Sequence, residues 1–342
     1  MRQLRLLLPA LPLLLAGCAT GAAPRQQPPP AAAATATAAA VVAAATVNSG
    51  RPTGPMTTVA VRDDARGRSA AGRPCRGTQP PAAYSHVVVV WMENASYADV
   101  VGAPRSWPWL DGTLLPRCGL LTGYRASGHP SLGNYLTATS GTARGLGATT
   151  DCGPRQCPQA QPSVFSALDR AHRSWRSYAE GMPAPCTVDS SGFYATKHVP
   201  ALYYRDVTRD CPTHVLPLTA FDRDLAAGRL PAYAVVTPDE CHDGHSCPAA
   251  DADAWLRSFV GRLTAGGDYR RGDTALLVVW DEGERSGAEG LHVPLVLVAP
   301  SVPAGLRVAT PAGHVDQLHL VQGLLRLPGG RQGIARAAHL AR

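Results

Sequence analysis

The stretch His86-Val-Val-Val-Val-Trp-Met-Glu-Asn94 decides the fold of this chain. Four consecutive valines followed by a tryptophan leave no polar face, which is typical of a strand buried on both faces. Three more short apolar runs follow, at residues 233–236, 275–280 and 295–298. We therefore expect a sheet whose central strands are covered on both sides.

Helical patterns lie between these apolar runs. The alternation predicts an α/β domain with a mostly parallel sheet and helices on both faces. Ligands in such folds bind outside the carboxyl ends of the strands, so the polar residues after each run are candidates for a site. The predicted helices cover Ser163–His172, Leu218–Ala227, Ala252–Leu263 and Val315–Leu325.

Composition narrows the class of protein. With 45% hydrophobic and 17% charged residues in 342, the chain is not wholly disordered, and its apolar runs are shorter than the ~20 residues of a membrane span. The net charge of +7 comes from residues 1–83, which hold nine Arg and two Asp. Residues 84–342 hold 23 basic and 23 acidic side chains, so we expect no nucleic-acid partner.

The N-terminus has the features of an export signal. Arg2 and Arg5 flank an apolar segment, Leu4–Leu15, that is too short to cross a bilayer. It ends in Leu15-Ala-Gly-Cys18, which resembles the bacterial lipobox, so we expect residues 1–18 to be a lipoprotein signal peptide. Lipidation of Cys18 would anchor the exported chain to a membrane of the cell envelope. An ordinary signal peptide cut nearby, giving a secreted protein, is the alternative.

Residues 19–83 are rich in Ala, Pro and Thr and have no apolar period that could bury a face. This composition predicts a disordered tether, followed by one folded domain over residues 84–342.

Eight cysteines follow Cys18, and an even number in an exported protein predicts disulfides. Eight cysteines allow 105 pairings, so the connectivity stays open, and a zinc site built from cysteines is the alternative. Short loops and then elimination favour the pairs Cys152/Cys157, Cys241/Cys247, Cys186/Cys211 and Cys75/Cys118.

Polar residues that could bind a ligand or take part in catalysis lie at four places. Glu93-Asn94 and Asp281-Glu282 each follow a predicted strand, and a loop ending at His245 follows another. Oxygen ligands at strand ends with histidines nearby suit a divalent cation. Gly128–Tyr135 contains Ser131 just before a predicted helix, where first-turn amides can bind a phosphate. Beside a metal, that hydroxyl can act as a nucleophile.

The order of these motifs resembles the bacterial and fungal phosphoesterase family. The motifs are Glu-Asn-x-Ser (93–96), His-Pro-Ser-x-x-Asn-Tyr (129–135) with Thr-Ser-Gly (139–141), Asp-x-His (243–245) and Trp-Asp-Glu (280–282). The family contains secreted acid phosphatases and non-specific phospholipases C on an alkaline-phosphatase-like α/β fold. The resemblance runs from about residue 86 to residue 327 and implies an exported, metal-dependent phosphomonoesterase. Phosphoinositides such as phosphatidylinositol 3-phosphate are among the substrates it implies.

The resemblance also implies roles for single residues. Ser131 matches the nucleophile, which would form a phosphoserine intermediate, and His198 or His245 would protonate the leaving alcohol. The metal, whether Ca²⁺, Mg²⁺ or Zn²⁺, would be held by Glu93, Asn94, Asp281 and Glu282. The substrate phosphate would be met by His129, Asn134, Asp243, His314 and Lys197, the last being the only lysine in the chain.

The chain departs from the family pattern at three positions. Gly133 stands where the family usually has proline, Asp239 where it has asparagine, and His242 is additional. These differences bear on the phosphate geometry and on the identity of the metal.

Three other functions remain open from the sequence. A phosphodiesterase of the phospholipase C type would use the same scaffold. A serine esterase would need Gly-x-Ser-x-Gly, which the segment from Gly128 to Gly133 misses by one residue. The third is a non-catalytic envelope lipoprotein.

Overall fold

The computed structural model describes residues 73–342, apart from residues 208 and 286. The expected signal peptide, Cys18 and most of the expected tether lie outside the described residues. Within the described part of the chain, no helix has the length and apolar character needed to cross a membrane.

A mostly parallel sheet forms the centre of the domain, as the alternation of elements predicts. Its strands are β1 (His86–Met92), β2 (Gly119–Leu121), β4 (Trp175–Ala179), β5 (Val215–Pro217), β6 (Tyr233–Thr237), β7 (Thr274–Trp280), β8 (Leu295–Val298) and β9 (Arg307–Val308). Their order is β5-β4-β6-β1-β7-β8-β2-β9, and only β8 runs antiparallel to its neighbours. Strands β3 (Tyr124–Arg125) and β10 (Ala312–Gly313) form a separate parallel pair.

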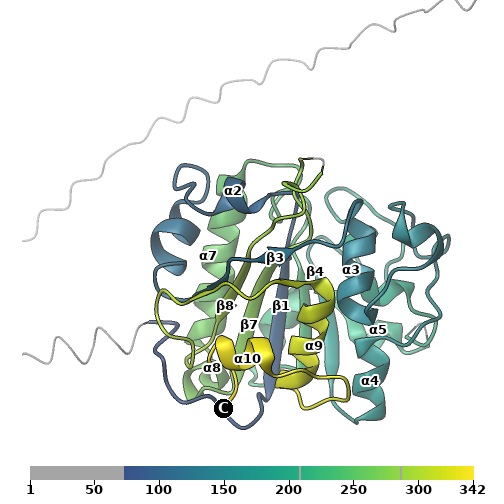
Figure 1. Cartoon of the computed structure of the whole chain (residues 1–342). Helices are drawn as coiled ribbons and strands as arrows, with labels where there is room; N and C mark the ends of the chain where they lie inside the picture. The colour runs from purple at the N-terminus through teal and green to yellow at the C-terminus, as the bar shows by residue number, and fades with distance from the viewer. Residues whose placement is uncertain (1–72, 208, 286) are drawn as a thin grey trace, which may run out of the picture. The chain divides into compact units, whose positions relative to one another are not determined.

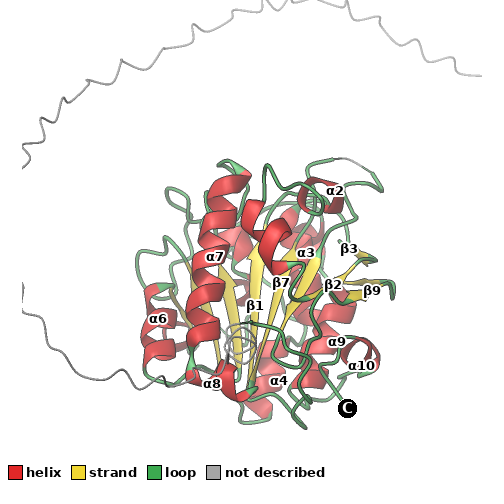
Figure 2. Ribbon diagram, turned by 90° about the vertical axis from the view of Figure 1, so that its left-hand side faces the viewer, coloured by secondary structure: helices red, strands yellow, loops and turns green. Residues whose placement is uncertain are grey.

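Helices cover both faces of the sheet. In Figure 2, α6 and α7 lie on one side of the strands, and α3, α9 and α10 lie on the other. The helices are α2 (Tyr97–Val100), α3 (Ser131–Ser140), α4 (Val164–Arg170), α5 (Cys211–His214), α6 (Thr219–Ala226), α7 (Ala249–Ala265), α8 (Gly267–Arg271), α9 (His314–Leu324) and α10 (Gly333–Ala337). Shorter turns are the π-helix η1 (Leu110–Leu114) and the 3₁₀ helices η2 (Gly145–Ala148), η3 (Thr196–His198) and η4 (Pro200–Tyr203).

The core follows from the valine-rich runs. Strand β1 lies beside β7 in the middle of the domain (Figure 1), with β6 on its other side. Every residue of β1 after His86 is buried. All seven residues of β7 are also buried. Both faces of these strands are covered by helices, which is why neither strand alternates polar with apolar residues.

The predicted strands and helices are present, and their ends agree with the prediction to within three residues. Strand β4 was not predicted, because its sequence Trp-Arg-Ser-Tyr-Ala contains polar side chains. The structure explains how it can lie inside the sheet: Arg176 forms an ion pair with the Asp224 carboxylate, and the Tyr178 hydroxyl donates to the same carboxylate at 2.7 Å.

The folded domain begins before the boundary expected at residue 84. Cys75 is buried and disulfide-bonded to Cys118, and the backbone N–H of Arg76 donates to the Pro300 carbonyl. The segment from residue 75 onward therefore packs on the domain instead of belonging to the tether. The remaining cysteines pair as Cys152–Cys157, Cys186–Cys211 and Cys241–Cys247, so the expected connectivity is the one the structure contains.

Asp253 on α7 offers a test of this packing. Its buried carboxylate accepts the backbone N–H groups of Trp109 and Leu110, both at 2.8 Å, at the start of η1. We expect Asp253→Ala to lower the free energy of unfolding by about 2–4 kcal/mol, because each buried amide left without a partner costs about 1–3 kcal/mol. Urea denaturation measures this change. Asp251→Ala, on the exposed side of the same helix, is the control and should cost less than about 1 kcal/mol.

Candidate functional site

The register of β1 and β7 brings two carboxylates together. Met92 pairs with Trp280 in the parallel ladder, so the next residues, Glu93 and Asp281, leave neighbouring strands at the same edge. The backbone N–H of Asp281 donates to the Met92 carbonyl at 3.1 Å, which extends the ladder to this point. Both side chains have no exposed surface. Two acidic groups thus lie buried at the carboxyl end of the sheet.

Ser131 contacts the first of these carboxylates. It is the first residue of α3, it is buried, and its Oγ donates to Glu93 Oε2 at 3.1 Å. Tyr135 lies one helical turn later on the same face, and its hydroxyl donates to Glu93 Oε1. The start of α3 therefore places both a serine hydroxyl and a phenol on one carboxylate.

Glu282 is held by one side chain from the loop before α3 and by one from the first turn of α3. His129 Nδ1 lies 3.2 Å from Glu282 Oε1, and Asn134 Nδ2 donates to Oε2 at 2.7 Å. Asn134 Oδ1 also accepts the backbone N–H groups of Ser127 and Gly128, at 2.9 and 3.2 Å. Asn134 thereby ties the loop before Ser131 to the carboxylate that follows β7.

Asn94 turns the chain at the end of β1. Its φ of +47° lies in the left-handed region, which asparagine adopts more readily than most residues. Its backbone N–H donates to Asp281 Oδ1 at 3.4 Å. The four residues expected to hold a metal, Glu93, Asn94, Asp281 and Glu282, therefore meet at one place.

His198 lies between two buried carboxylates. Its Nε2 is 3.3 Å from Glu93 Oε1, and its Nδ1 is 3.3 Å from Asp243 Oδ2. Burial, together with the charge of Lys197, lowers the pKa of His198 well below its ordinary value, so the ring is neutral near pH 7. A neutral imidazole carries one N–H, so His198 can donate to one of the two carboxylates, and with no exposed edge it is poorly placed to protonate a leaving group.

His245 is more accessible than His198. It is only partly buried, and its backbone N–H donates to Asp243 Oδ1 at 2.8 Å. Its ring centroid lies 6.2 Å from that of His198, toward the outside of the site. Burial and then the charge of Lys197 lower the pKa of His245.

Lys197 forms the positive side of the site. Its Nζ lies 3.5 Å from Asp151 Oδ2 and 3.8 Å from Glu240 Oε1. Burial acts to lower its pKa, but the charges of Asp151, Glu93 and Glu240 outweigh burial and raise it, so the ammonium stays charged. Asp151 Oδ1 accepts the backbone N–H of Leu132 at 2.9 Å, directly after Ser131. The lysine is thus linked to the start of α3.

His314 lies behind the carboxylates. It is fully buried, its Nε2 is 2.8 Å from the backbone carbonyl of Asp281, and its Nδ1 is 2.7 Å from the Tyr124 hydroxyl. Burial lowers the pKa of His314 to about 4. The sequence assigned this histidine to the substrate, whereas its contacts are with the backbone that carries Asp281.

The donor set fits a cation. Burial and the charges of Asp281 and Asp243 raise the pKa of Glu93 well above its ordinary value. Burial also raises the pKa of Asp281 and of Glu282 to about 7. Asp281 Oδ2 is buried and has no hydrogen-bond partner among the described residues, although Asp281 Oδ1 accepts the Glu282 amide. A divalent cation would bind this orphaned oxygen and relieve the repulsion between the carboxylates.

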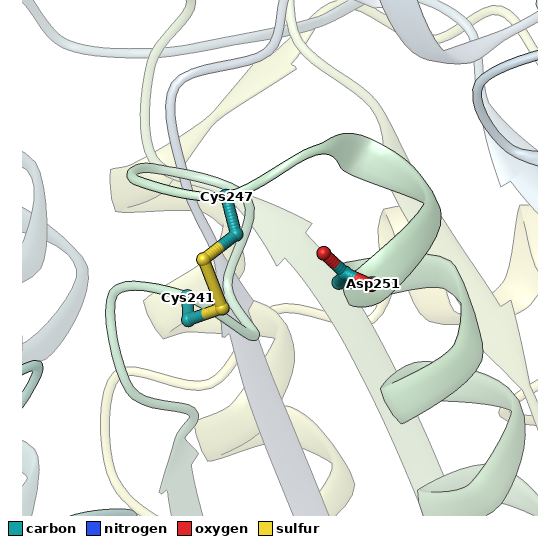
Figure 3. Close-up of side chains that lie close together, drawn as sticks. All are labelled: Cys241, Cys247 and Asp251. Carbon is teal, nitrogen blue, oxygen red and sulfur yellow. A yellow bond between two sulfur atoms is a disulfide. The ribbon is translucent and has the colours of Figure 1, made fainter. Parts of the chain in front are cut away.

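A cluster of two cysteines and one aspartate, of kinds that can bind zinc, is not a metal site. Cys241, Cys247 and Asp251 lie close together at the start of α7 (Figure 3). The two sulfurs are bonded to each other, so neither is available as the thiolate that zinc requires. All eight cysteines of the described residues are paired in this way, which removes the zinc–cysteine alternative.

Sequence reasoning missed three residues of the site. Tyr135 stood inside the quoted motif, and only its contact with Glu93 shows a role. Glu240 lay in the histidine loop without a distinguishing spacing. Asp151 lies in the loop before the Cys152–Cys157 disulfide and gave no signal at all, because its link to Lys197 spans 46 positions of sequence.

Comparisons with known proteins agree with the geometry. The phosphoesterase family model matches residues 122–328. A phosphatidylinositol-3-phosphatase of Mycobacterium tuberculosis is 32% identical over 251 residues, covering 72% of this chain and 78% of the relative. An acid phosphatase of Aspergillus fumigatus is 28% identical over 238 residues, covering 66% of this chain and 50% of the relative. This chain thus spans half the length of that fungal enzyme.

Solved structures show the fold. An alkaline phosphatase superfamily protein from Vibrio parahaemolyticus superimposes with a TM-score of 0.52 at 13% identity, over 75% of this chain and 73% of that chain. A lipoteichoic acid synthase from Listeria monocytogenes gives a TM-score of 0.52 at 12% identity, over 79% of this chain and 78% of that chain. The alkaline-phosphatase-like fold expected from the sequence is confirmed.

The raised carboxyl pKa values predict how the metal-free protein responds to pH. Burial raises the pKa of Asp243 to about 8 and those of Asp281 and Glu282 to about 7, whereas the unfolded chain releases these protons near pH 4. The folded state therefore binds more protons, and this stability, complete below about pH 4, is lost as the pH rises to about 8. We expect the Tm of chelator-treated protein to fall by several degrees between about pH 5 and about pH 9.

Added divalent cation should restore more Tm at the higher pH, because protons and metal compete for the same oxygens. Differential scanning calorimetry with and without chelator measures both effects. The variant Asp243→Asn, which cannot ionise, is the control and should show a weaker dependence on pH. A Tm of the metal-free protein that stays level or rises over this range would contradict the assignment.

Proposed function

The chain belongs to the phosphoesterase family and is a hydrolase of phosphoric ester bonds, and from that premise we propose that it is an exported, metal-dependent phosphomonoesterase with Ser131 as nucleophile. The observation that carries the proposal is the contact of Ser131 Oγ with Glu93 Oε2 at 3.1 Å, beside Asp281 and Glu282. A hydroxyl among buried carboxylates at the start of a helix is an arrangement suited to attack on a phosphate.

Ser131 would attack phosphorus in line and expel the alcohol of the ester. The Ser131–phosphorus bond forms as the phosphorus–alkoxide bond breaks, which leaves a phosphoserine that water then hydrolyses. The Ser131 hydroxyl already donates to Glu93, so the Glu93 carboxylate is the group toward which its proton would move. A divalent cation held by Glu93, Asn94, Asp281 and Glu282 would supply Lewis-acid stabilisation of the charge that develops during transfer.

His245 is the better candidate for protonating the leaving alcohol. It is partly exposed at the outer side of the site, whereas His198 is enclosed between Glu93 and Asp243. We assign His198 to positioning the two carboxylates. Lys197 and His129 would bind the phosphate oxygens from the outer side of the site, because both side chains are partly exposed. His129 contacts Glu282, and Lys197 contacts Asp151, which accepts the N–H of Leu132 next to Ser131.

The geometry gives the serine esterase little support. An esterase serine needs a histidine base within hydrogen-bond distance of its hydroxyl. Among the described residues, the hydrogen bond that Ser131 donates goes to a carboxylate, and His198 contacts Glu93 and Asp243. The acidic surroundings favour a phosphate ester bound with a cation over a carboxylic ester.

Export and the substrate are also part of the proposal. Four disulfides suit an oxidising compartment outside the cytoplasm, and the segment ending at Cys18 supplies a signal and a lipid anchor. We take the substrate to be a phosphate monoester. The relative named phosphatidylinositol-3-phosphatase makes a phosphoinositide the first monoester to assay.

Replacement of the nucleophile tests the reaction. We expect Ser131→Ala to lower kcat for release of inorganic phosphate by at least about 10³-fold, with little change in Tm, because it removes the attacking oxygen. Purified protein with added divalent cation is assayed on phosphatidylinositol 3-phosphate and on p-nitrophenyl phosphate. Ser140→Ala, at the other end of α3, is the matched control and should retain activity. Near-normal phosphate release by Ser131→Ala would contradict the proposal. Release of phosphocholine from phosphatidylcholine would favour the phosphodiesterase.

The role of His245 predicts a dependence on the leaving group. We expect His245→Asn to lower kcat about 10²–10⁴-fold for alkyl phosphates, whose alcohols must be protonated as they leave. p-Nitrophenyl phosphate should be affected much less, because p-nitrophenolate leaves without a proton. Steady-state kinetics on the two substrates measure the difference. Equal losses on both substrates would assign His245 to phosphate binding instead.

A further inference from the structure

Another cluster of side chains able to bind a metal lies at the carboxyl ends of β4 and β6, beside the site built on β1 and β7. Glu180 directly follows β4, and Asp239 follows β6 by one proline. Ala179 pairs with Thr237 in the parallel ladder, so the two carboxylates leave neighbouring strands at the same edge. His242 joins them from the loop after β6. One ligand atom from each of the three residues lies within 4.8 Å of the others.

We propose that Glu180, Asp239 and His242 bind a second divalent transition-metal ion, of the zinc type, separate from the cation of the Ser131 site. One imidazole nitrogen with two carboxylate oxygens is a donor set that zinc accepts, with water in the remaining position. Calcium and magnesium prefer oxygen-only sets, so the histidine selects against them.

The distances fit such an ion. His242 Nδ1 lies 3.0 Å from Glu180 Oε2 and 3.3 Å from Asp239 Oδ1. Ligand atoms about 2.0–2.2 Å from a tetrahedral zinc are about 3.3–3.5 Å apart, so the two distances from His242 Nδ1 are close to those of a zinc site, and the third pair of ligand atoms lies within 4.8 Å.

The two carboxylates are oriented by the backbone without a metal. Glu180 Oε2 accepts the N–H of Asp239 at 3.2 Å. Asp239 Oδ1 accepts the N–H groups of Cys241 and His242, at 3.1 and 3.0 Å. The two N–H groups occupy both lone pairs of Asp239 Oδ1, so the capacity of this carboxylate for an ion lies in its second oxygen, whereas Glu180 has capacity at both oxygens. Hydrogen bonds of this kind orient the residues that bind the ion in known metal sites.

The charge and the exposure of the cluster provide separate support. Among the ion pairs of the described residues, Glu180 and Asp239 pair with no Arg or Lys, only with His242, which is charged solely when protonated. A divalent cation would balance both carboxylates whatever the protonation of the ring. The side chains of Glu180, Asp239 and His242 are 24%, 15% and 38% exposed, so an ion can enter and keep water ligands.

The ion would stabilise the loop that carries two residues of the Ser131 site. The N–H of Asp243 donates to the Asp239 carbonyl at 2.8 Å, and the Cys241–Cys247 disulfide closes the same loop. Asp243 and His245 thus follow directly after the proposed ligands. The inference does not depend on the proposed function, because zinc binding at this loop requires no catalysis.

The test measures zinc itself. Purified protein with intact disulfides is equilibrated with Zn²⁺, passed through a desalting column and analysed for metal by mass spectrometry, and zinc-edge anomalous scattering is recorded from crystals. We expect an anomalous peak between the carboxylates of Glu180 and Asp239 and His242 Nδ1. His242→Ala and Asp239→Asn should each lose one equivalent of zinc, with affinity at this site weakened at least about 100-fold, because loss even of a residue that only hydrogen-bonds to a metal ligand costs up to about 100-fold.

The variants are chosen so that a failure to fold cannot imitate the result. Asp239→Asn keeps an oxygen acceptor for the amides of Cys241 and His242, and its Tm without zinc shows that the loop has folded. His319→Ala, on α9, is the matched histidine control and should keep its zinc. Equal zinc content in wild type and His242→Ala, with no anomalous peak at the cluster, would reduce it to an ion pair of His242. Phosphate release, measured in parallel, tests the proposed function, and its loss with zinc content unchanged would contradict that function and leave the zinc site standing.

Discussion

The pairing of Met92 with Trp280 forces Glu93 and Asp281 to lie side by side without contact with water. Burial penalises the charge of each carboxylate and raises both pKa values; the charge of Asp281 raises the pKa of Glu93 further, and the charge of Glu282 raises that of Asp281. The rest of the site can be understood as a response to this repulsion. Ser131 and Tyr135 donate hydrogen bonds to Glu93. Asp281 Oδ2 is buried and accepts no hydrogen bond from the described residues, so a cation bound there would compensate its charge.

Other residues hold the carboxylates in place without meeting the substrate. Asn134 links Glu282 to the loop before Ser131, and His314 fixes the backbone of Asp281 from behind. His198 separates Glu93 from Asp243. This arrangement holds the carboxylate oxygens in fixed positions around the Ser131 hydroxyl. Fixed charges of this kind suit the electrostatic stabilisation that phosphoryl transfer requires. Positioning of this kind explains why so many of the motif residues are buried.

The fold by itself does not select this chemistry. A lipoteichoic acid synthase shares the same architecture with a TM-score of 0.52 at 12% identity, which is a likeness of fold alone. Function on a shared fold depends on the side chains that follow the strands. In this chain those are the acidic residues after β1 and β7, and the same edge of the sheet carries Glu180 and Asp239 after β4 and β6.

The sequence by itself determined the buried strands, their alternation with helices and the motif residues. An apolar run such as His86–Met92 is stable only where both faces of the strand are buried, and the polar residues that follow such strands lie at the carboxyl edge of the sheet. It could not show β4, whose polar side chains are satisfied by Asp224, far along the chain. Nor could it show that His314 lies behind Asp281, or that Asp151 links Lys197 to the start of α3. Those contacts join segments distant in sequence, and only the packing of helices on the sheet decides which of them meet.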